Sequence, residues 1–195
     1  AGILHIIVYV GFIVINIELV EIVLDGLLGT HRMFAPYMGE VYNFFIASFE
    51  ILALLVLVSV ILFWLRRNAL KIKRFWKSEM KGWPKNDADY ILYFEIVLMT
   101  LFLSMNATDQ LLQELGEPHY TQAGLFPVSK FMTPLFSSFS TTKLVMLERS
   151  FWWLHITGIL IFLNYLYYSK HLHILLAFPN TYFQNLNPIG GFKNN

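Results

Sequence analysis

Two histidines, His155 and His173, lie eighteen residues apart in the last long apolar stretch of the chain. At about 100° per residue, eighteen residues make five whole turns of α-helix. On one continuous helix, the two imidazoles would project from the same face, about 27 Å apart along the axis. Imidazole is a common metal ligand, and ionisable side chains inside a membrane are usually functional because they are costly to bury there. The spacing therefore predicts two levels at which one helix face could hold a metal cofactor.

Other histidines are candidates for the opposite ligand at each level. His5 lies at the start of the first apolar stretch, so antiparallel helices would bring it to the depth of His173. Two histidines on facing helices are a common way to hold a b-type haem for electron transfer. His171 lies about 160° around the helix from the other face, so we prefer His173 as the ligand. His31, which follows two glycines that permit a bend, is the candidate partner of His155.

Carboxylates inside the apolar stretches are candidates for proton transfer. Glu18 and Glu21 lie within about 60° of arc on one face of the first stretch. Glu50 lies in the second stretch. Buried acids in membranes pair with bases, accept hydrogen bonds or carry protons. Because a quinone site needs a proton donor or acceptor near its redox centre, these three glutamates are candidates for it, together with His31. In the alternative interpretation, Glu21 and Asp25 already lie among lipid headgroups with Arg32 as counter-ion.

The composition is that of a membrane protein. Hydrophobic residues make up 56% of the 195 residues and charged residues 14%, whereas a soluble domain has about 25% charged residues. We expect four spans, at residues 3–28, 41–65, 88–114 and 150–176, in an all-α, polytopic four-helix bundle that forms a single domain. The chain has no cysteine, which excludes a thiolate zinc site or an iron–sulfur cluster held by this chain alone.

The distribution of basic residues predicts the orientation in the membrane. The first connection between spans holds Arg32 as its one basic residue, and the second holds eight: Arg66, Arg67, Lys71, Lys73, Arg74, Lys77, Lys81 and Lys85. By the positive-inside rule, the second connection and both ends of the chain are cytoplasmic. The same basic patch is also suited to anionic lipid or a protein partner. A net charge of +1 gives no indication of a nucleic-acid partner.

Two segments resemble a known family. The first is WWLHITGILIFLNYLYYSKHLHILLAFPNTYF, and it resembles the last membrane helix of the respiratory nitrate reductase gamma-subunit superfamily. Within that superfamily, it is most similar to the membrane portions of heterodisulfide-reductase-like iron–sulfur oxidoreductases. The second segment, LHIIVYVGFIVI, is similar to their earlier haem-ligand helix. The resemblance implies a b-type cytochrome anchor in a bacterial or archaeal cytoplasmic membrane, which exchanges electrons between quinone and an iron–sulfur partner.

The resemblance also implies which histidines hold haem. In the nitrate reductase subunit, two co-facial histidines on the last helix serve two haems, and His155 and His173 match that pattern. The earlier helix of that subunit carries two histidines, where this chain has His5 alone. The subunit also has five spans, so a helix preceding Ala1 is expected in a longer form of the chain. We expect one haem b, with a second haem as the open question.

The sequence thus favours an electron-transfer subunit of an oxidoreductase complex over a complete enzyme. Its expected cofactor is haem b, its substrate is membrane quinone, and its partner is an iron–sulfur protein on the cytoplasmic face. Two other interpretations stay open. One is a haem-free membrane anchor or assembly subunit whose histidines lie at the membrane interfaces. The other is a proton-conducting subunit built on Glu18, Glu50 and Glu95.

Overall fold

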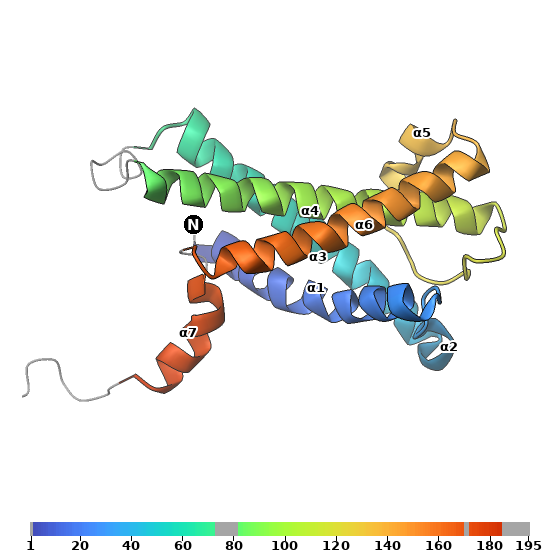
Figure 1. Cartoon of the computed structure of the whole chain (residues 1–195), viewed down its shortest axis with the longest axis horizontal. Coiled ribbons are helices and arrows are strands. Elements are labelled where there is room, and N and C mark those ends of the chain that lie inside the picture. Colours follow the sequence, from blue (N-terminus) through green and yellow to red (C-terminus); the bar gives the residue numbers. More distant parts are fainter. Residues whose placement is uncertain (1, 73–81, 170–171, 185–195) are drawn as a thin grey trace, which may run out of the picture.

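The structure is a computed structural model that describes residues 2–72, 82–169 and 172–184. These residues form an all-α bundle without strands (Figure 1). The four long helices are α1 (Gly2–Leu28), α3 (Glu40–Trp64), α4 (Trp83–Glu114) and α6 (Thr141–Leu166). Each of the four is long and apolar enough to cross a membrane. The predicted all-α bundle with four membrane-spanning helices is therefore confirmed.

Short helical segments connect the long helices or follow them. A one-turn helix, α2 (Ala35–Met38), joins α1 to α3, and α3 continues directly into a π-helical turn, η1 (Leu65–Ala69). The connection between α4 and α6 contains the 3₁₀ turn η4 (Ser129–Phe131) and the one-turn helix α5 (Thr133–Phe136). A final helix, α7 (His173–Tyr182), follows α6.

Local sequence signals explain where the helices begin and end. α1 ends in a Schellman motif, in which Gly29 adopts a φ of +69° and the Thr30 amide donates a hydrogen bond to the Asp25 carbonyl at 3.1 Å. α4 begins directly after Gly82 with a proline in its first turn, where the missing amide proton costs nothing. The four long helices contain no proline apart from the one in the first turn of α4.

The helices pack in the spatial order α1, α3, α4, α6. α1 packs mainly on α3, α3 packs on α4, and α6 packs mainly on α4. The largest cluster of buried apolar residues lies between these helices and includes Ala53, Val60 and Phe102. The N-terminal end of α1, the turn η1 and the start of α7 lie at one end of the bundle, here called the α7 end (Figure 1). The segments α2 and α5 lie at the opposite end, here called the α2 end.

The predicted fourth span, residues 150–176, is wrong at both of its ends. Helix α6 begins at Thr141 and not at residue 150. It ends at Leu166, after 26 residues, which at 1.5 Å per residue is about 39 Å and already exceeds a hydrocarbon core of about 30 Å. After Leu166 the chain leaves the α-helix through a tight turn, in which the amide of Ser169 bonds to the Leu166 carbonyl at 3.1 Å.

This turn overturns the prediction of a common helix face for the two histidines. His155 lies near the middle of α6, whereas His173 is the first residue of α7. α7 runs away from the bundle at an angle to α6 (Figure 1). The eighteen-residue spacing therefore does not place both imidazoles on one continuous helix, although the two histidines still lie at different levels of the molecule.

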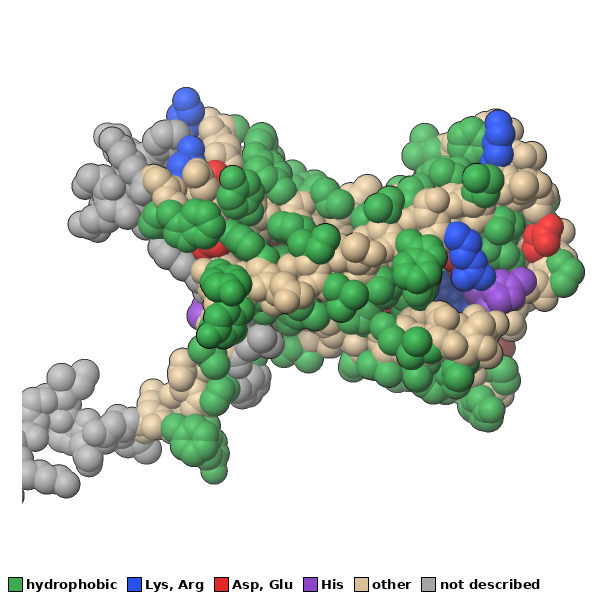
Figure 2. Space-filling view, viewed as in Figure 1, with side chains coloured by type: hydrophobic (Ala, Val, Ile, Leu, Met, Phe, Trp, Pro, Cys, Tyr) green, Lys and Arg blue, Asp and Glu red, His purple; other side chains and the backbone are tan. Residues whose placement is uncertain are grey.

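The outer surface matches a lipid environment. In the view of Figure 2, hydrophobic side chains cover much of the lateral surface, and the described charged side chains lie mainly near the two ends. Exposed apolar side chains occur along the lengths of the spans, for example Ile13 and Ile17 on α1, Val58 on α3 and Leu160 on α6. In water, exposed apolar surface of this extent would mark an interface.

Close contact between α1 and α3 requires a glycine at position 11. A Cβ atom added to Gly11 would lie 2.4 Å from Cγ2 of Val56, a side chain that is stiff at χ1. We expect Gly11→Ala to lower the free energy of unfolding by about 1–3 kcal/mol through overpacking. As a matched control, Gly2→Ala adds a methyl group with nothing within 4 Å. Unfolding in mixed micelles measures both; equal stability of the two variants would contradict the α1–α3 contact.

Candidate functional site

An apolar cavity lies between α1, α4 and α6, with Val56 of α3 also in its wall. The cavity is open on one side and has a volume of about 80 Å³. Most lining side chains are aliphatic or aromatic, including Phe12, Ile15 and Phe162. Three lining residues carry polar side chains: Asn16, Glu95 and His155.

His155 is oriented in this cavity by a backbone carbonyl. Its side chain is buried, and its Nδ1 lies 3.0 Å from the Leu98 oxygen. A carbonyl oxygen only accepts hydrogen bonds, so Nδ1 carries the proton and Nε2 keeps its lone pair. Among the described residues, none donates a hydrogen bond to this Nε2. Metal-bound histidines are generally held in this way, with the second ring nitrogen donating to a carbonyl or carboxylate.

Gly158 explains how the Leu98 carbonyl comes within reach of His155. A Cβ atom at position 158 would lie 2.8 Å from Cδ2 of Leu98. The glycine, one turn after His155, therefore lets α6 approach α4 closely at this level. The aromatic ring of Phe102, also on α4, lies 5.8 Å from the imidazole centroid and completes the apolar surroundings.

His5 and His173 are both exposed side chains at the α7 end of the bundle (Figure 1). The His5 ring packs against Phe63 of α3, with centroids 4.6 Å apart. The alternative ligand His171 lies outside the described residues. The two predicted ligands thus share one end of the bundle, but they come from α1 and α7 and not from α1 and α6.

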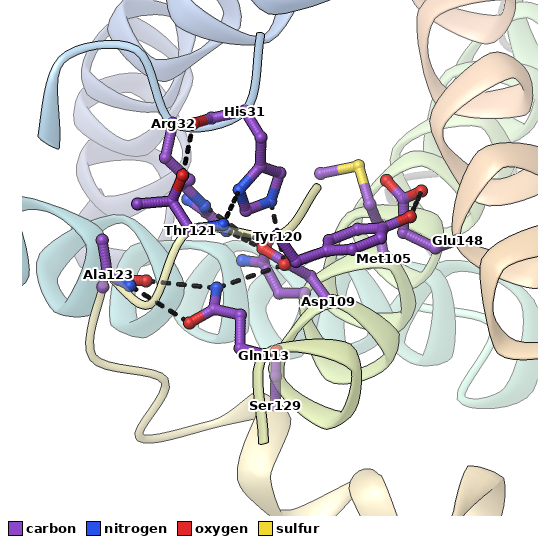
Figure 3. A network of polar contacts seen from close by, with 12 residues as sticks. His31, Arg32, Met105, Asp109, Gln113, Tyr120, Thr121, Ala123, Ser129 and Glu148 are labelled. Atoms are coloured by element: carbon purple, nitrogen blue, oxygen red, sulfur yellow. Dashed lines mark hydrogen bonds and ion pairs between the residues drawn. The ribbon is translucent and has the colours of Figure 1, made fainter. Parts of the chain in front are cut away.

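A buried network of polar side chains occupies the α2 end, and Arg32 is at its centre (Figure 3). The Arg32 Nη2 donates to Asp109 Oδ2 at 2.7 Å and to Asn106 Oδ1 at 3.2 Å. Its guanidinium also lies over the Phe126 ring, 5.1 Å from the centroid. Burial lowers the pKa of Arg32, but Asp109, Tyr42 and Glu18 together outweigh this effect and hold that pKa above its usual range. The guanidinium is therefore a permanent buried cation.

His31 has both ring nitrogens engaged in the same network. Its Nδ1 accepts the Thr121 amide proton at 2.9 Å, and its Nε2 lies 2.9 Å from Asp109 Oδ1 (Figure 3). An Nδ1 that accepts from an amide cannot carry a proton, so Nε2–H donates to the carboxylate. These contacts tie the chain after α1 to the connection after α4. Ligation of a haem by His31 stays a prediction, and it would require one of these hydrogen bonds to break.

Glu21 and Glu50, two of the predicted proton carriers, each bind several donors. Glu21 accepts the Tyr42 hydroxyl proton at 2.7 Å and the Phe34 amide proton at 3.0 Å, which fixes the turn into α2. Glu50 accepts the amide protons of Val128 at 2.9 Å and of Ser129 at 3.1 Å, together with the Ser129 hydroxyl proton. It therefore caps the start of η4 from within the membrane span of α3. The hydrogen bonds of both glutamates therefore hold backbone segments in position.

Glu18 differs from these two acids. Its side chain is 2% exposed, and neither carboxylate oxygen has a hydrogen-bond partner among the described residues. The nearest basic group is the Arg32 Nη1, 3.6 Å from Oε1. Glu18 lines a second, polar pocket at the α2 end, together with His31, Arg32, Asp109 and Arg149.

His119 and Tyr120 contact two residues that line this polar pocket, Arg149 and Glu148. His119 Nε2 lies 2.6 Å from Arg149 Nη2, and Tyr120 donates its hydroxyl proton to Glu148 at 2.9 Å. Partial burial and the positive charge of Arg149 lower the pKa of His119. Burial and the nearby carboxylate raise the pKa of Tyr120 above its usual range. Because a guanidinium can only donate, His119 Nε2 accepts a hydrogen bond from Arg149.

The central position of Arg32 was not predicted from the sequence, which suggested a counter-ion to Glu21 and Asp25 near the headgroups. A signal was present in α4, where Asn106 and Asp109 are spaced three residues apart and so share one helix face. Two polar residues on one face of a membrane span call for a buried partner. Among the described residues, no group of three or more His, Asp and Glu side chains is arranged to hold a metal ion directly.

Comparison with known proteins gives one informative similarity. A Bacillus subtilis (strain 168) protein, described as "Probable iron-sulfur-binding oxidoreductase FadF", is similar to nearly the whole chain. The two sequences are 25% identical over 190 residues, which cover 97% of this chain. The chain spans about a quarter of the length of that protein, since the match covers 25% of it. No family model matches the chain, and no solved structure does.

The buried ion pair generates a stability prediction. We expect Arg32→Gln to lower the free energy of unfolding by about 3–5 kcal/mol, because the substitution leaves Asp109 buried without its cation. Arg149→Gln is the matched control, since the Arg149 side chain is 42% exposed and pairs with Glu148 at 3.4 Å; we expect it to cost no more than about 1 kcal/mol. Unfolding monitored by circular dichroism in mixed micelles measures both. Similar losses in the two variants would refute the central position of Arg32.

Proposed function

We propose that this chain is the membrane electron carrier of an oxidoreductase system. It holds haem b and relays electrons between a membrane quinone and an iron–sulfur partner. It acts as a subunit or membrane portion of that system and not as a complete enzyme. The haem supplies reversible one-electron chemistry, and the protein supplies its ligands, its orientation and an apolar surrounding.

The observation that carries this proposal is the arrangement of His155. A buried imidazole faces an apolar cavity, and the Leu98 carbonyl 3.0 Å from Nδ1 leaves Nε2 as the ligating nitrogen. Histidine held in a helical bundle by such a second contact is a common ligand of haem iron. Phe12, Phe102 and Phe162 contribute aromatic surface to the walls, which is the kind of surface that an apolar ring system contacts. His155 is the one histidine among the described residues that line this cavity.

His5 and His173 are proposed as the ligand pair of a haem at the α7 end. Both side chains are accessible, and both belong to segments that meet at this end of the bundle (Figure 1). The described basic residues of the second connection, including Arg66 and Lys71, lie at the same end. We place this end on the cytoplasmic side of a bacterial or archaeal membrane by the positive-inside rule. A haem here would exchange electrons with the iron–sulfur partner.

The similarity to the Bacillus subtilis protein supports an oxidoreductase role. That protein is described as iron–sulfur-binding, and the match covers 25% of it. This chain has no cysteine, so an iron–sulfur cluster would be held outside these 195 residues. We therefore propose that the iron–sulfur group belongs to a partner chain or to a further domain.

The quinone is placed at the α2 end in this proposal. Helix α1 packs mainly on α3 and helix α6 mainly on α4, which leaves a route from the lipid between α1 and α6. The polar pocket with Glu18 lies next to the apolar cavity, since Ile22 lines both. Glu21 and Glu50 position the surrounding backbone by their hydrogen bonds, so Glu18 is the carboxylate best placed to exchange a proton.

A spectroscopic experiment tests the role of His155. We expect the purified wild-type protein to show a b-type absorption band on reduction with a soluble quinol analogue. The variant His155→Ala should lose at least part of that absorption because the haem iron loses its ligand. His119→Ala is the control, since His119 is exposed and contacts Arg149; we expect it to keep the full absorption. Equal spectra for both variants would contradict ligation by His155.

The same preparation separates the alternative functions. A folded wild-type protein without any b-type absorption would indicate a haem-free membrane anchor. A proton-conducting subunit built on Glu50 finds less support, because the described hydrogen bonds engage both Glu50 oxygens in holding Asn106 and the start of η4. Such a subunit would also be unaffected by loss of His155.

A further inference from the structure

Within the part of the chain that the structure describes, Glu18 is a buried carboxyl group without hydrogen-bond donors inside a membrane span. It lies in the second half of α1, it is 2% exposed, and both of its oxygens lack a hydrogen-bond donor among the described residues. An ionised carboxylate without donors is very unfavourable in apolar surroundings, whereas the neutral acid is tolerated. The structure therefore favours a state of Glu18 in which the carboxyl group holds a proton.

The neighbouring acids do not share this property. Asp109 accepts hydrogen bonds from Arg32 and Gln113, and Glu148 accepts one from Tyr120. Asp25 likewise accepts the Arg32 amide proton at 2.8 Å. The donor in each of these contacts favours the ionised form of the carboxylate that accepts it. Glu18 is the one acid of the polar pocket whose described surroundings leave both oxygens without a donor.

The charges around Glu18 do not compensate for the missing donors. Titratable and charged groups surround Glu18 from every neighbouring element. On α1 these are Glu21 and Asp25, and the chain after α1 adds His31 and Arg32. The other helices contribute Tyr42 and Glu50 from α3, Asp109 from α4, and Glu148 and Arg149 from α6. The one buried cation among these groups, Arg32, approaches Glu18 only to 3.6 Å and forms its short contact, 2.7 Å, with Asp109. The carboxyl groups around Arg32 are thus more numerous than the single positive charge available to them.

The polar pocket gives Glu18 access to the aqueous phase at the α2 end. Its lining extends from Glu18 to Thr30, which is exposed, and to Arg149, whose side chain is 42% exposed. In Figure 2, a hollow at this end of the molecule is bordered by basic and histidine side chains. Protons can therefore enter from one side of the membrane without crossing the apolar part of the bundle.

We propose that Glu18 is a proton-exchange site that serves the α2 end of the bundle. Its carboxylate takes up one proton from the aqueous phase at this end to become a neutral acid, and it releases that proton to the same side. This inference deepens the proposed function, in which a quinone gains or loses protons near the polar pocket. Proton binding by Glu18 does not itself need haem, so the two proposals can fail separately.

Infrared difference spectroscopy of the full chain in lipid nanodiscs tests the inference. Between alkaline and mildly acidic buffer, we expect wild-type protein to gain a carbonyl stretching band of a protonated carboxyl group. The band should shift to lower frequency in D₂O, because the proton exchanges with the aqueous phase. Glu18→Gln should lose the band. Persistence of the band in this variant, or a band that does not shift in D₂O, would overturn the proposal.

Two further variants make the assignment specific. Glu21→Gln is the matched control, because Glu21 lies one turn away and already accepts two hydrogen bonds; we expect it to retain the band. Glu18→Asp keeps a carboxyl group and should retain a band of changed frequency, which provides a test if Glu18→Gln does not fold. An unchanged frequency in Glu18→Asp would overturn the assignment. Because no haem is needed, each outcome is independent of the b-type absorption.

Discussion

The buried pair of Arg32 and Asp109 is the interaction on which the α2 end of this molecule depends. Its contact of 2.7 Å joins the short segment after α1 to the middle of the polar face of α4. Placing a guanidinium and a carboxylate away from water is costly, and the pair is favourable only when their remaining donors and acceptors are also satisfied. Asn106, His31 and Gln113 supply those additional contacts. The polar network therefore forms only when the chain is folded at this end, and it in turn stabilises the fold there.

The network divides the bundle into two parts of different chemistry. At the α2 end, Glu21 and Glu50 hold backbone amides, so that the connections after α1 and α4 are fixed from inside the membrane spans. Toward the middle, the walls become apolar and His155 faces a cavity that the Leu98 carbonyl helps to organise. In the proposed function, proton exchange and electron transfer would thus have separate but adjacent places.

The helical architecture was predictable from the sequence, because hydropathy and length suffice to identify four membrane spans. The end of α6 was not, since no proline or glycine marks Leu166 and the apolar pattern continues beyond it. That turn separates His155 from His173, so a periodicity argument over eighteen residues failed. The burial of Glu18, Glu21 and Glu50 followed from their position in apolar stretches. Their hydrogen-bond partners did not, because Phe34, Val128 and Ser129 come from connections whose path depends on the tertiary fold.

The account as a whole depends on whether the histidines hold haem. The stoichiometry of haem to protein in a purified, folded preparation is the most direct measurement. A pyridine haemochrome spectrum gives the amount of haem b, and quantitative amino-acid analysis gives the amount of chain. The account predicts at least one haem b per chain, and two if His155 and the pair of His5 and His173 each serve a separate haem. A folded preparation without haem b would contradict it.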